Sequence, residues 1–158
     1  MRIAVYSRSF PVLSETFIIN QIVGLIRLGV EVDIIADKLV SSDVMHSSVQ
    51  KYNLLERVKC SGIPQKKSKI AQIYLTAINS FFLILKGRYS QFFNILFDRC
   101  LSNMQKINLI YLLNRNNAKT LSYTNIICHF GNNGYYVCKL RELGLISGPV
   151  STVFHGQE

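Results

Sequence analysis

The stretch RIAVYSRSFPVLSETFIINQIVGLIRLGVEVDIIA, residues 2–36, decides the fold of this chain. Its opening segment, 2–7, is rich in β-prone residues and starts almost at the first residue. Apolar side chains then recur at helical spacing through 14–28, with Ser14 placed to cap the start of the helix. Residues 30–36 read as a second strand. A strand, a helix and a strand in this order predict a right-handed βαβ unit with parallel strands.

The same rhythm returns near the end of the chain. Residues 124–130 and 150–154 have the composition of strands, and 132–144 between them has the pattern of a helix. The middle, from 68 to 113, is helical in pattern and favours two or three amphipathic helices. The fold class is therefore α/β, with a Rossmann-like parallel sheet flanked by helices.

Length and composition favour one domain over residues 1–158. The chain has 158 residues, and 49% of them are apolar, which suffices for one core. No run of 18 uncharged apolar residues occurs, and Ser7 and Arg8 interrupt the first apolar run too early for a signal peptide. We therefore expect a cytoplasmic protein.

The cysteines give no sign of a metal site or of a disulfide framework. There are four of them, without CxxC spacing and without clustered histidines. We interpret all four as reduced residues that pack in the interior: Cys60, Cys100, Cys128 and Cys138.

The positive charge is concentrated in one segment. The net charge is +9, and residues 59–119 hold ten basic side chains against the single acid Asp98. The ten are Lys59, Lys66, Lys67, Lys69, Lys86, Arg88, Arg99, Lys106, Arg115 and Lys119. We predict a basic helical insertion at about 59–119. It could be a solvated helix face, a surface for an anionic membrane, or a nucleic-acid surface. No nucleic-acid-binding motif accompanies it, so we expect no nucleic acid partner.

Three segments that follow predicted strands carry the functional signal. They are residues 8–16, 129–134 and 155–158, and they contain His129 and His155, two of the three histidines. Ligands of open parallel sheets bind outside the carboxyl ends of the strands, because loops and helix N-termini converge there. We therefore place the candidate site at this edge of the sheet.

Structural roles remain open for several of these residues. A histidine at a strand end is often a hydrogen-bonded core or surface residue. Ser14 and Glu15 are also what the start of a helix needs, although the same turn could hold a phosphate. We assign no role to His46, which lies in a polar loop. The chain has neither GxGxxG nor GxxxxGK[ST], which disfavours a nicotinamide or flavin site of the usual kind and P-loop enzymes.

Three motifs together resemble the N-terminal domain of family-4 glycosyltransferases of the GT-B fold. They are SFPVLSETFIINQIVGLIRLGVEVDIIA (9–36), IICHFGNNG (126–134) and VSTVFHGQE (150–158). The chain is similar to the bacterial enzymes that build colanic acid, amylovoran and other surface polysaccharides. The order of the motifs matches over the whole chain, while the basic middle is matched only in kind.

This resemblance implies a reaction. It is a retaining transfer of a sugar from a nucleotide-sugar donor to a lipid-linked or oligosaccharide acceptor, in the biosynthesis of capsule, exopolysaccharide or O-antigen. No cofactor and no metal is implied, since the nucleotide-sugar is itself a substrate. Basic, aromatic helices of such domains commonly touch the membrane, which implies a peripheral location at the inner face of the bacterial cytoplasmic membrane.

The resemblance also implies roles for particular residues. His155 matches the catalytic histidine that faces the donor sugar. The substrate-binding residues implied are Phe10, Pro11, Ser14, Glu15, His129, Gly131, Asn132, Gly156 and Glu158. Most relatives have Asp where this chain has Glu158, which leaves the role of that acid open.

The resemblance covers only the N-terminal half of a GT-B fold, which implies that the C-terminal nucleotide-sugar domain is missing from these 158 residues. We expect the chain alone to be inactive, because no cationic partner would stabilise the diphosphate leaving group. The alternative is a non-catalytic module that binds membrane or acceptor and acts with a separate C-terminal half.

Overall fold

A five-stranded parallel sheet forms the centre of the computed structural model, which describes residues 1–40, 46–60, 62, 68–115 and 120–155. The strand order is β3-β2-β1-β5-β7, and every neighbouring pair is parallel. The strands are β1 (Arg2–Phe10), β2 (Glu31–Leu39), β3 (Val58–Cys60), β5 (Asn125–His129) and β7 (Val150–Val153). This confirms the Rossmann-like α/β class, with the order of strands reversing between β1 and β5.

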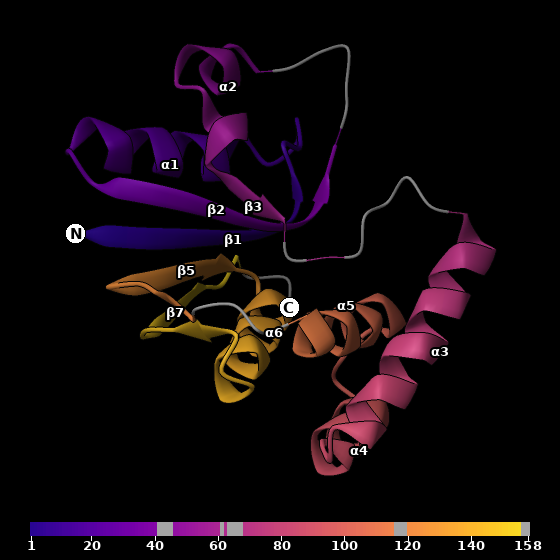
Figure 1. Ribbon diagram of the computed structural model, residues 1–158. Coiled ribbons are helices and arrows are strands. Elements are labelled where there is room, and N and C mark those ends of the chain that lie inside the picture. The colour runs from indigo at the N-terminus through magenta and orange to yellow at the C-terminus, as the bar shows by residue number, and fades with distance from the viewer. Residues whose placement is uncertain (41–45, 61, 63–67, 116–119, 156–158) are drawn as a thin grey trace.

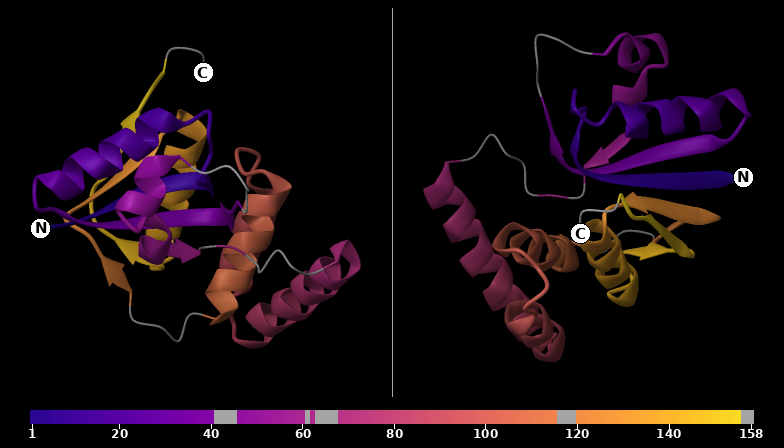
Figure 2. Two further views of the ribbon diagram at one scale, coloured as in Figure 1. Left: turned by 90° about the horizontal axis from the view of Figure 1, so that it is seen from above. Right: turned by 180° about the vertical axis from the view of Figure 1, so that it is seen from behind.

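Helices cover both faces of the sheet (Figure 1). On one side lie α1 (Thr16–Arg27) and α2 (Ser47–Lys51), and on the other α5 (Asn103–Arg115) and α6 (Gly131–Glu142). The helices α3 (Lys69–Leu85) and α4 (Tyr89–Phe97) lie outside α5, farther from the sheet, in all views (Figures 1 and 2). The remaining elements are short: η1 (Leu54–Arg57), β4 (Leu121–Ser122) and β6 (Ile146–Ser147).

Alternation along the strands divides the core into two halves. Val5 of β1 joins the half beneath α1, where it meets Ile18 and Ile22. Tyr6, the next residue, joins the other half, which includes Tyr136 of α6. Successive side chains of a strand point to opposite faces, so a continuous apolar run is what a sheet covered on both sides requires.

The start of α1 differs from the prediction. The helix begins at Thr16, its N-cap residue is Glu15, and no side chain caps it. A turn precedes the helix, in which Glu15 N donates to Val12 O at 3.1 Å. The carbonyl of Glu15 then accepts the first hydrogen bond of the helix, from Ile18 N. Ser14 lies within this turn and is exposed, and its predicted capping role is wrong.

The interpretation of the cysteines is wrong for one of them. Cys128 is buried, and burial raises the pKa of its thiol to about 12, as expected for an inert packing residue. Cys138 is partly buried, whereas Cys100 is exposed. Cys100 follows Asp98, whose carboxylate accepts from the Cys100 backbone N at 2.9 Å, and this turn directs the residue to solvent.

In the described part of residues 59–119 the predicted helices are α3, α4 and α5, and three of the cations there donate to backbone carbonyls of the fold. Lys86 Nζ donates to the backbone oxygen of Asn114 at 3.2 Å, and Arg88 donates to Leu113 O at 3.0 Å, both at the end of α5. Lys106 donates to Leu96 O at 2.9 Å, at the end of α4. Cations at helix C-termini satisfy the last carbonyls and oppose the negative end of the helix dipole.

Among the residues that the structure describes, no helix has the length and apolar character needed to cross a bilayer.

Candidate functional site

Two histidines meet where β5 and β7 end, at the carboxyl edge of the sheet. His129 is the last residue of β5 and pairs in register with Val153, two positions before His155. Nδ1 of His129 lies 3.0 Å from Nε2 of His155, and the two rings are stacked with centroids 5.3 Å apart. Two residues that were expected at this edge thus form one hydrogen-bonded group, which we call the histidine pair.

Helix α1 supplies two further members of this site. Phe17 packs its ring 4.7 Å from the centroid of His155 and 5.2 Å from that of His129. Gln21, one helical turn later, places Oε1 2.7 Å from Nε2 of His129. Residues four apart share one face of a helix, so the first turns of α1 present both side chains to the end of β5.

The two histidines differ in environment. His129 is 3% exposed, whereas His155 is exposed and also contacts Phe130 with ring centroids 5.0 Å apart. Burial lowers the pKa of His129, and the neighbouring His155 lowers it further. A buried neutral imidazole can hold an exposed one in place while the exposed ring faces a ligand.

The turn from β5 into α6 is tight. Phe130 caps α6 with a φ of 71°, which is uncommon for a residue with a side chain. At Gly131 a Cβ would lie 3.0 Å from Cε1 of Phe154, so the ring of Phe154 packs directly against this turn. Asn133 Nδ2 donates to the carbonyl of His129 at 2.8 Å and ties the helix to the strand.

Glu15 lies in a partly buried position after β1. The hydroxyl of Ser7 donates to Ser9 O at 2.7 Å and lies 3.4 Å from Oε2 of Glu15. Burial raises the pKa of Glu15, and the contact with Ser7 opposes this without cancelling it. A carboxyl group of raised pKa at this edge can exchange a proton or a hydrogen bond with a ligand.

The other predicted site residues lie in varied places. Phe10 is buried at 2% exposed and Pro11 is buried beside it, so their side chains belong to the core. Ser14 and Asn132 are exposed, Asn132 in the first turn of α6. Gly156 and Glu158 lie outside the residues that the structure describes.

A cavity that the sequence did not suggest opens at the ends of β1 and β2. It has a volume of about 290 Å³ and is lined by Arg8, Ser9, Asp37, Lys38, Gln72, Met104 and Asn108. The sequence gives little sign of this cavity, because Arg8 and Lys38 are 30 positions apart. They become neighbours only because β1 and β2 pair in the register Ser9↔Lys38. Phe17 and Gln21 were also missed, because only the packing of α1 over the end of β5 brings them to the histidine pair.

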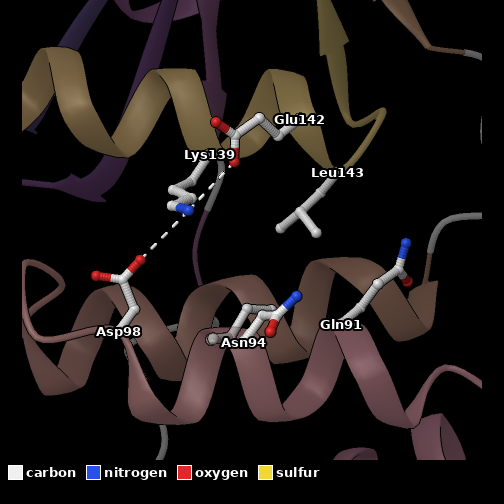
Figure 3. A pocket seen from close by; sticks show the side chains of 7 residues that line it. Gln91, Asn94, Asp98, Lys139, Glu142 and Leu143 are labelled. Carbon is white, nitrogen blue, oxygen red and sulfur yellow. Dashed lines mark ion pairs between the residues drawn. The ribbon is translucent and has the colours of Figure 1, made fainter.

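A second cavity, of about 230 Å³, lies between α4 and α6 (Figure 3). Lys139 lies in it, 3.4 Å from Asp98 and 3.2 Å from Glu142. Burial opposes ionisation of Asp98, but hydrogen bonds from Tyr135, the Cys100 backbone N and Lys139 outweigh it, and the pKa of Asp98 is lowered. These contacts fasten the helical segment to the sheet domain, toward the far end of α6 from the histidine pair.

Across the described part of the chain, no three side chains of His, Cys, Asp or Glu gather closely enough to hold a metal ion.

Comparison with known proteins gives relatives of one kind. The chain is 32% identical over 157 residues to WcaL of Escherichia coli (strain K12), described as a colanic acid biosynthesis glycosyltransferase. It is 28% identical to WcaL of Salmonella typhimurium and 31% identical to the amylovoran biosynthesis glycosyltransferase AmsK of Erwinia amylovora. These matches cover 99 to 100% of this chain and 37 to 38% of the relatives. No family model and no solved structure matches. By sequence, this Rossmann-like chain is similar to glycosyltransferases of colanic acid and amylovoran biosynthesis, and it spans somewhat more than a third of their length.

Proposed function

We propose that this chain is the acceptor-side part of a retaining glycosyltransferase of surface polysaccharide biosynthesis. The enzyme transfers a sugar from a nucleotide-sugar to a lipid-linked or oligosaccharide acceptor. The observation that carries the proposal is the histidine pair, because residues from two separate motifs of the resemblance meet within 3.0 Å at the ligand-binding edge of the sheet. The similarity to WcaL and AmsK over the whole chain supports the same conclusion.

The residues at this edge suit a sugar substrate. His155 is exposed and can exchange a hydrogen bond with a sugar hydroxyl near the reacting carbon. Phe17 and Phe130 flank its ring and offer apolar surface to the carbon-bound hydrogens of a sugar. The groups that hold the nucleotide and stabilise its diphosphate would come from the part of the relatives that this chain does not span, so we expect no turnover by the chain alone.

A chimera tests this function. Residues 1–155 would be joined to the part of Escherichia coli WcaL that follows the matched region, and radiolabelled sugar transfer to membrane acceptors would be measured. We expect transfer by the chimera and none by the 158-residue chain. The change His155→Ala should lower the rate about 100-fold, which is the usual effect of removing one group that stabilises the transition state.

A matched control is available in the third histidine. His46 only caps α2, where its Nδ1 accepts from Ser48 N at 3.2 Å. His46→Ala should therefore leave transfer within about twofold of the parent chimera. Equal losses of transfer rate for His155→Ala and His46→Ala would contradict a role for His155. Turnover by the chain alone would contradict the proposal that the groups which hold the nucleotide lie outside this chain.

We also propose that α3 and α4 contact the anionic inner surface of the cytoplasmic membrane. This proposal is supported by the large apolar side chains that α3 and α4 expose, which we call the α3–α4 apolar set: Ile70, Ile73, Tyr74, Phe81, Phe82, Ile84, Leu85, Tyr89, Phe93, Leu96 and Phe97. Such a concentration outside the core favours an interaction surface over a solvated helix face. Because Lys86, Arg88 and Lys106 donate to backbone carbonyls, the apolar set supplies the larger part of the attraction.

Vesicle flotation tests the membrane contact. Tyr74→Ser combined with Phe81→Ser removes two side chains that are 67% and 60% exposed on α3. We expect the partition coefficient on phosphatidylcholine–phosphatidylglycerol vesicles to fall about 30-fold, because each of the two rings loses about 1 kcal/mol of apolar burial on partial insertion. Leu28→Ser, at a residue 80% exposed outside these helices, is the control and should bind as the parent chain does. Equal binding by all three would contradict the proposal, and binding without transfer by the chimera would favour a non-catalytic membrane module.

A further inference from the structure

We propose that Gln21 is a positioning residue that fixes the tautomer of His155 through His129. The proposal deepens the proposed function and rests on it for its consequence in sugar transfer. Its geometric basis is a chain of two hydrogen bonds, 2.7 Å from Gln21 Oε1 to His129 Nε2 and 3.0 Å from His129 Nδ1 to His155 Nε2. We call this chain the Gln21 relay.

The proton positions follow from the chemistry of each group. A carboxamide oxygen only accepts, so Nε2 of His129 carries the hydrogen that it donates to Gln21. A neutral imidazole has one N–H, which leaves Nδ1 of His129 as an acceptor. Nε2 of His155 must then be the donor of the second bond. The relay therefore holds the neutral His155 with its hydrogen on Nε2 and a lone pair on Nδ1.

The surroundings of the relay make this choice effective. His129 is 3% exposed, so water competes little for its two nitrogens. Phe17 contacts both imidazole rings, and Phe130 contacts that of His155. Hydrogen bonds that are shielded from water are stronger electrostatically, and a wrong tautomer would bring two donors or two acceptors together.

Sequence gives no reason to select Gln21 on its own. Asn20 precedes it on the same helix and is exposed, whereas Gln21 is half-buried and faces the end of β5. The relay also explains why a buried histidine stands at the end of β5, where an apolar residue would pack without needing partners.

The tautomers can be read directly by nitrogen NMR. The chain would be labelled with ¹⁵N-histidine and studied at about pH 8, above the ordinary histidine pKa of about 6.5. Only three histidines contribute signals, and His46 is an internal reference because its Nδ1 is an acceptor from Ser48 N. We expect the Nε2–H pattern for both His129 and His155 in the parent chain.

Two substitutions of Gln21 should act in opposite ways. In Gln21→Glu the carboxylate can only accept, so both histidines should keep the Nε2–H pattern. In Gln21→Lys the ammonium can only donate, so His129 and then His155 should change to the Nδ1–H pattern. Asn20→Lys adds the same charge one position earlier on the exposed face and should change neither tautomer.

The outcomes separate the relay from the function on which it rests. The same His155 tautomer in the Glu and Lys variants would overturn the relay, as would an Nδ1–H pattern in the parent chain. If the Lys variant fails to fold, a loss of the Nε2–H pattern of His129 in Gln21→Glu overturns it instead. In the WcaL chimera, Gln21→Lys should lower kcat about tenfold, the value of one hydrogen bond, and Gln21→Glu should not. The NMR result needs no substrate, so an inactive chimera would leave the relay standing while removing the proposed function.

Discussion

Gly148→Ala should lower the free energy of unfolding by about 3 to 5 kcal/mol, from backbone strain together with overpacking. Gly148 lies between β6 and β7 with a φ of 136°, a conformation that residues with side chains rarely adopt. An added Cβ would also lie 2.4 Å from the carbonyl oxygen of Tyr123. That oxygen belongs to the backbone and cannot turn aside as the end of a side chain can. Urea unfolding followed by circular dichroism measures the loss.

Two other glycines separate the causes of this effect. Gly87 has a φ of 72° with nothing within 4 Å of an added Cβ, so Gly87→Ala isolates the conformational strain of a left-handed residue, about 1 to 2 kcal/mol. Gly24 is helical and equally open, so Gly24→Ala should stabilise the chain by about 0.5 to 1 kcal/mol. A loss in Gly148→Ala no larger than that in Gly87→Ala would show that the backbone of Tyr123 yields to the methyl group.

Gly148 matters because of what Tyr123 holds together. Tyr123 N donates to Ser147 O at 2.9 Å, and its hydroxyl donates to Asp33 Oδ2 at 3.1 Å. Asp33 also accepts from Arg2, the first residue of β1. This network lies near the start of β1, whereas the histidine pair lies at the opposite, carboxyl edge of the sheet. Stability and the proposed chemistry therefore depend on different ends of the same strands.

The sequence was sufficient for four of the five strands of the sheet, all but β3, and for the edge that carries the candidate site. The βαβ pattern in residues 2–36 predicted two neighbouring parallel strands, and the general rule for such sheets placed His129 and His155 at one edge. The hydrogen bond between them was not predictable, because it depends on the register His129↔Val153 and on the distance between two side chains. Gln21 was missed for the same reason, since only the packing of α1 over the end of β5 makes it a partner.

The basic segment shows a different limit. Counting charges in residues 59–119 located the positive excess in the sequence but could not say what each cation contacts. Lys86 and Arg88 follow α3 in the sequence, yet their partners are the last carbonyls of α5, more than 20 positions later. The composition gives the excess of basic residues, whereas the packing of the helices determines how many of these cations remain available to a partner.

Asp33→Ala should destabilise the chain by about 2 to 4 kcal/mol, because it leaves two partners of a buried carboxylate without their acceptor. Asp33 is 7% exposed on β2, and it lies 2.7 Å from Arg2 and 3.1 Å from the hydroxyl of Tyr123. The side chain of Arg2 is 38% exposed and can recover some hydration, which keeps the expected loss below that of a fully buried pair. Thermal and urea unfolding would give the two measures of the loss.

Arg2 itself supplies the control for this prediction, because it pairs with two acids in different surroundings. Glu31 lies 3.3 Å from it with a side chain 63% exposed, so Glu31→Ala should cost at most about 0.5 kcal/mol. Tyr123→Phe removes only the second hydrogen bond to Asp33 and should cost about 1 kcal/mol. Since both changes break the same bond, the loss in Asp33→Ala combined with Tyr123→Phe should be smaller than the sum of the single losses. Additive losses, or equal losses for Asp33→Ala and Glu31→Ala, would mean that burial does not strengthen this network and that the amino edge of the sheet is held by apolar packing alone.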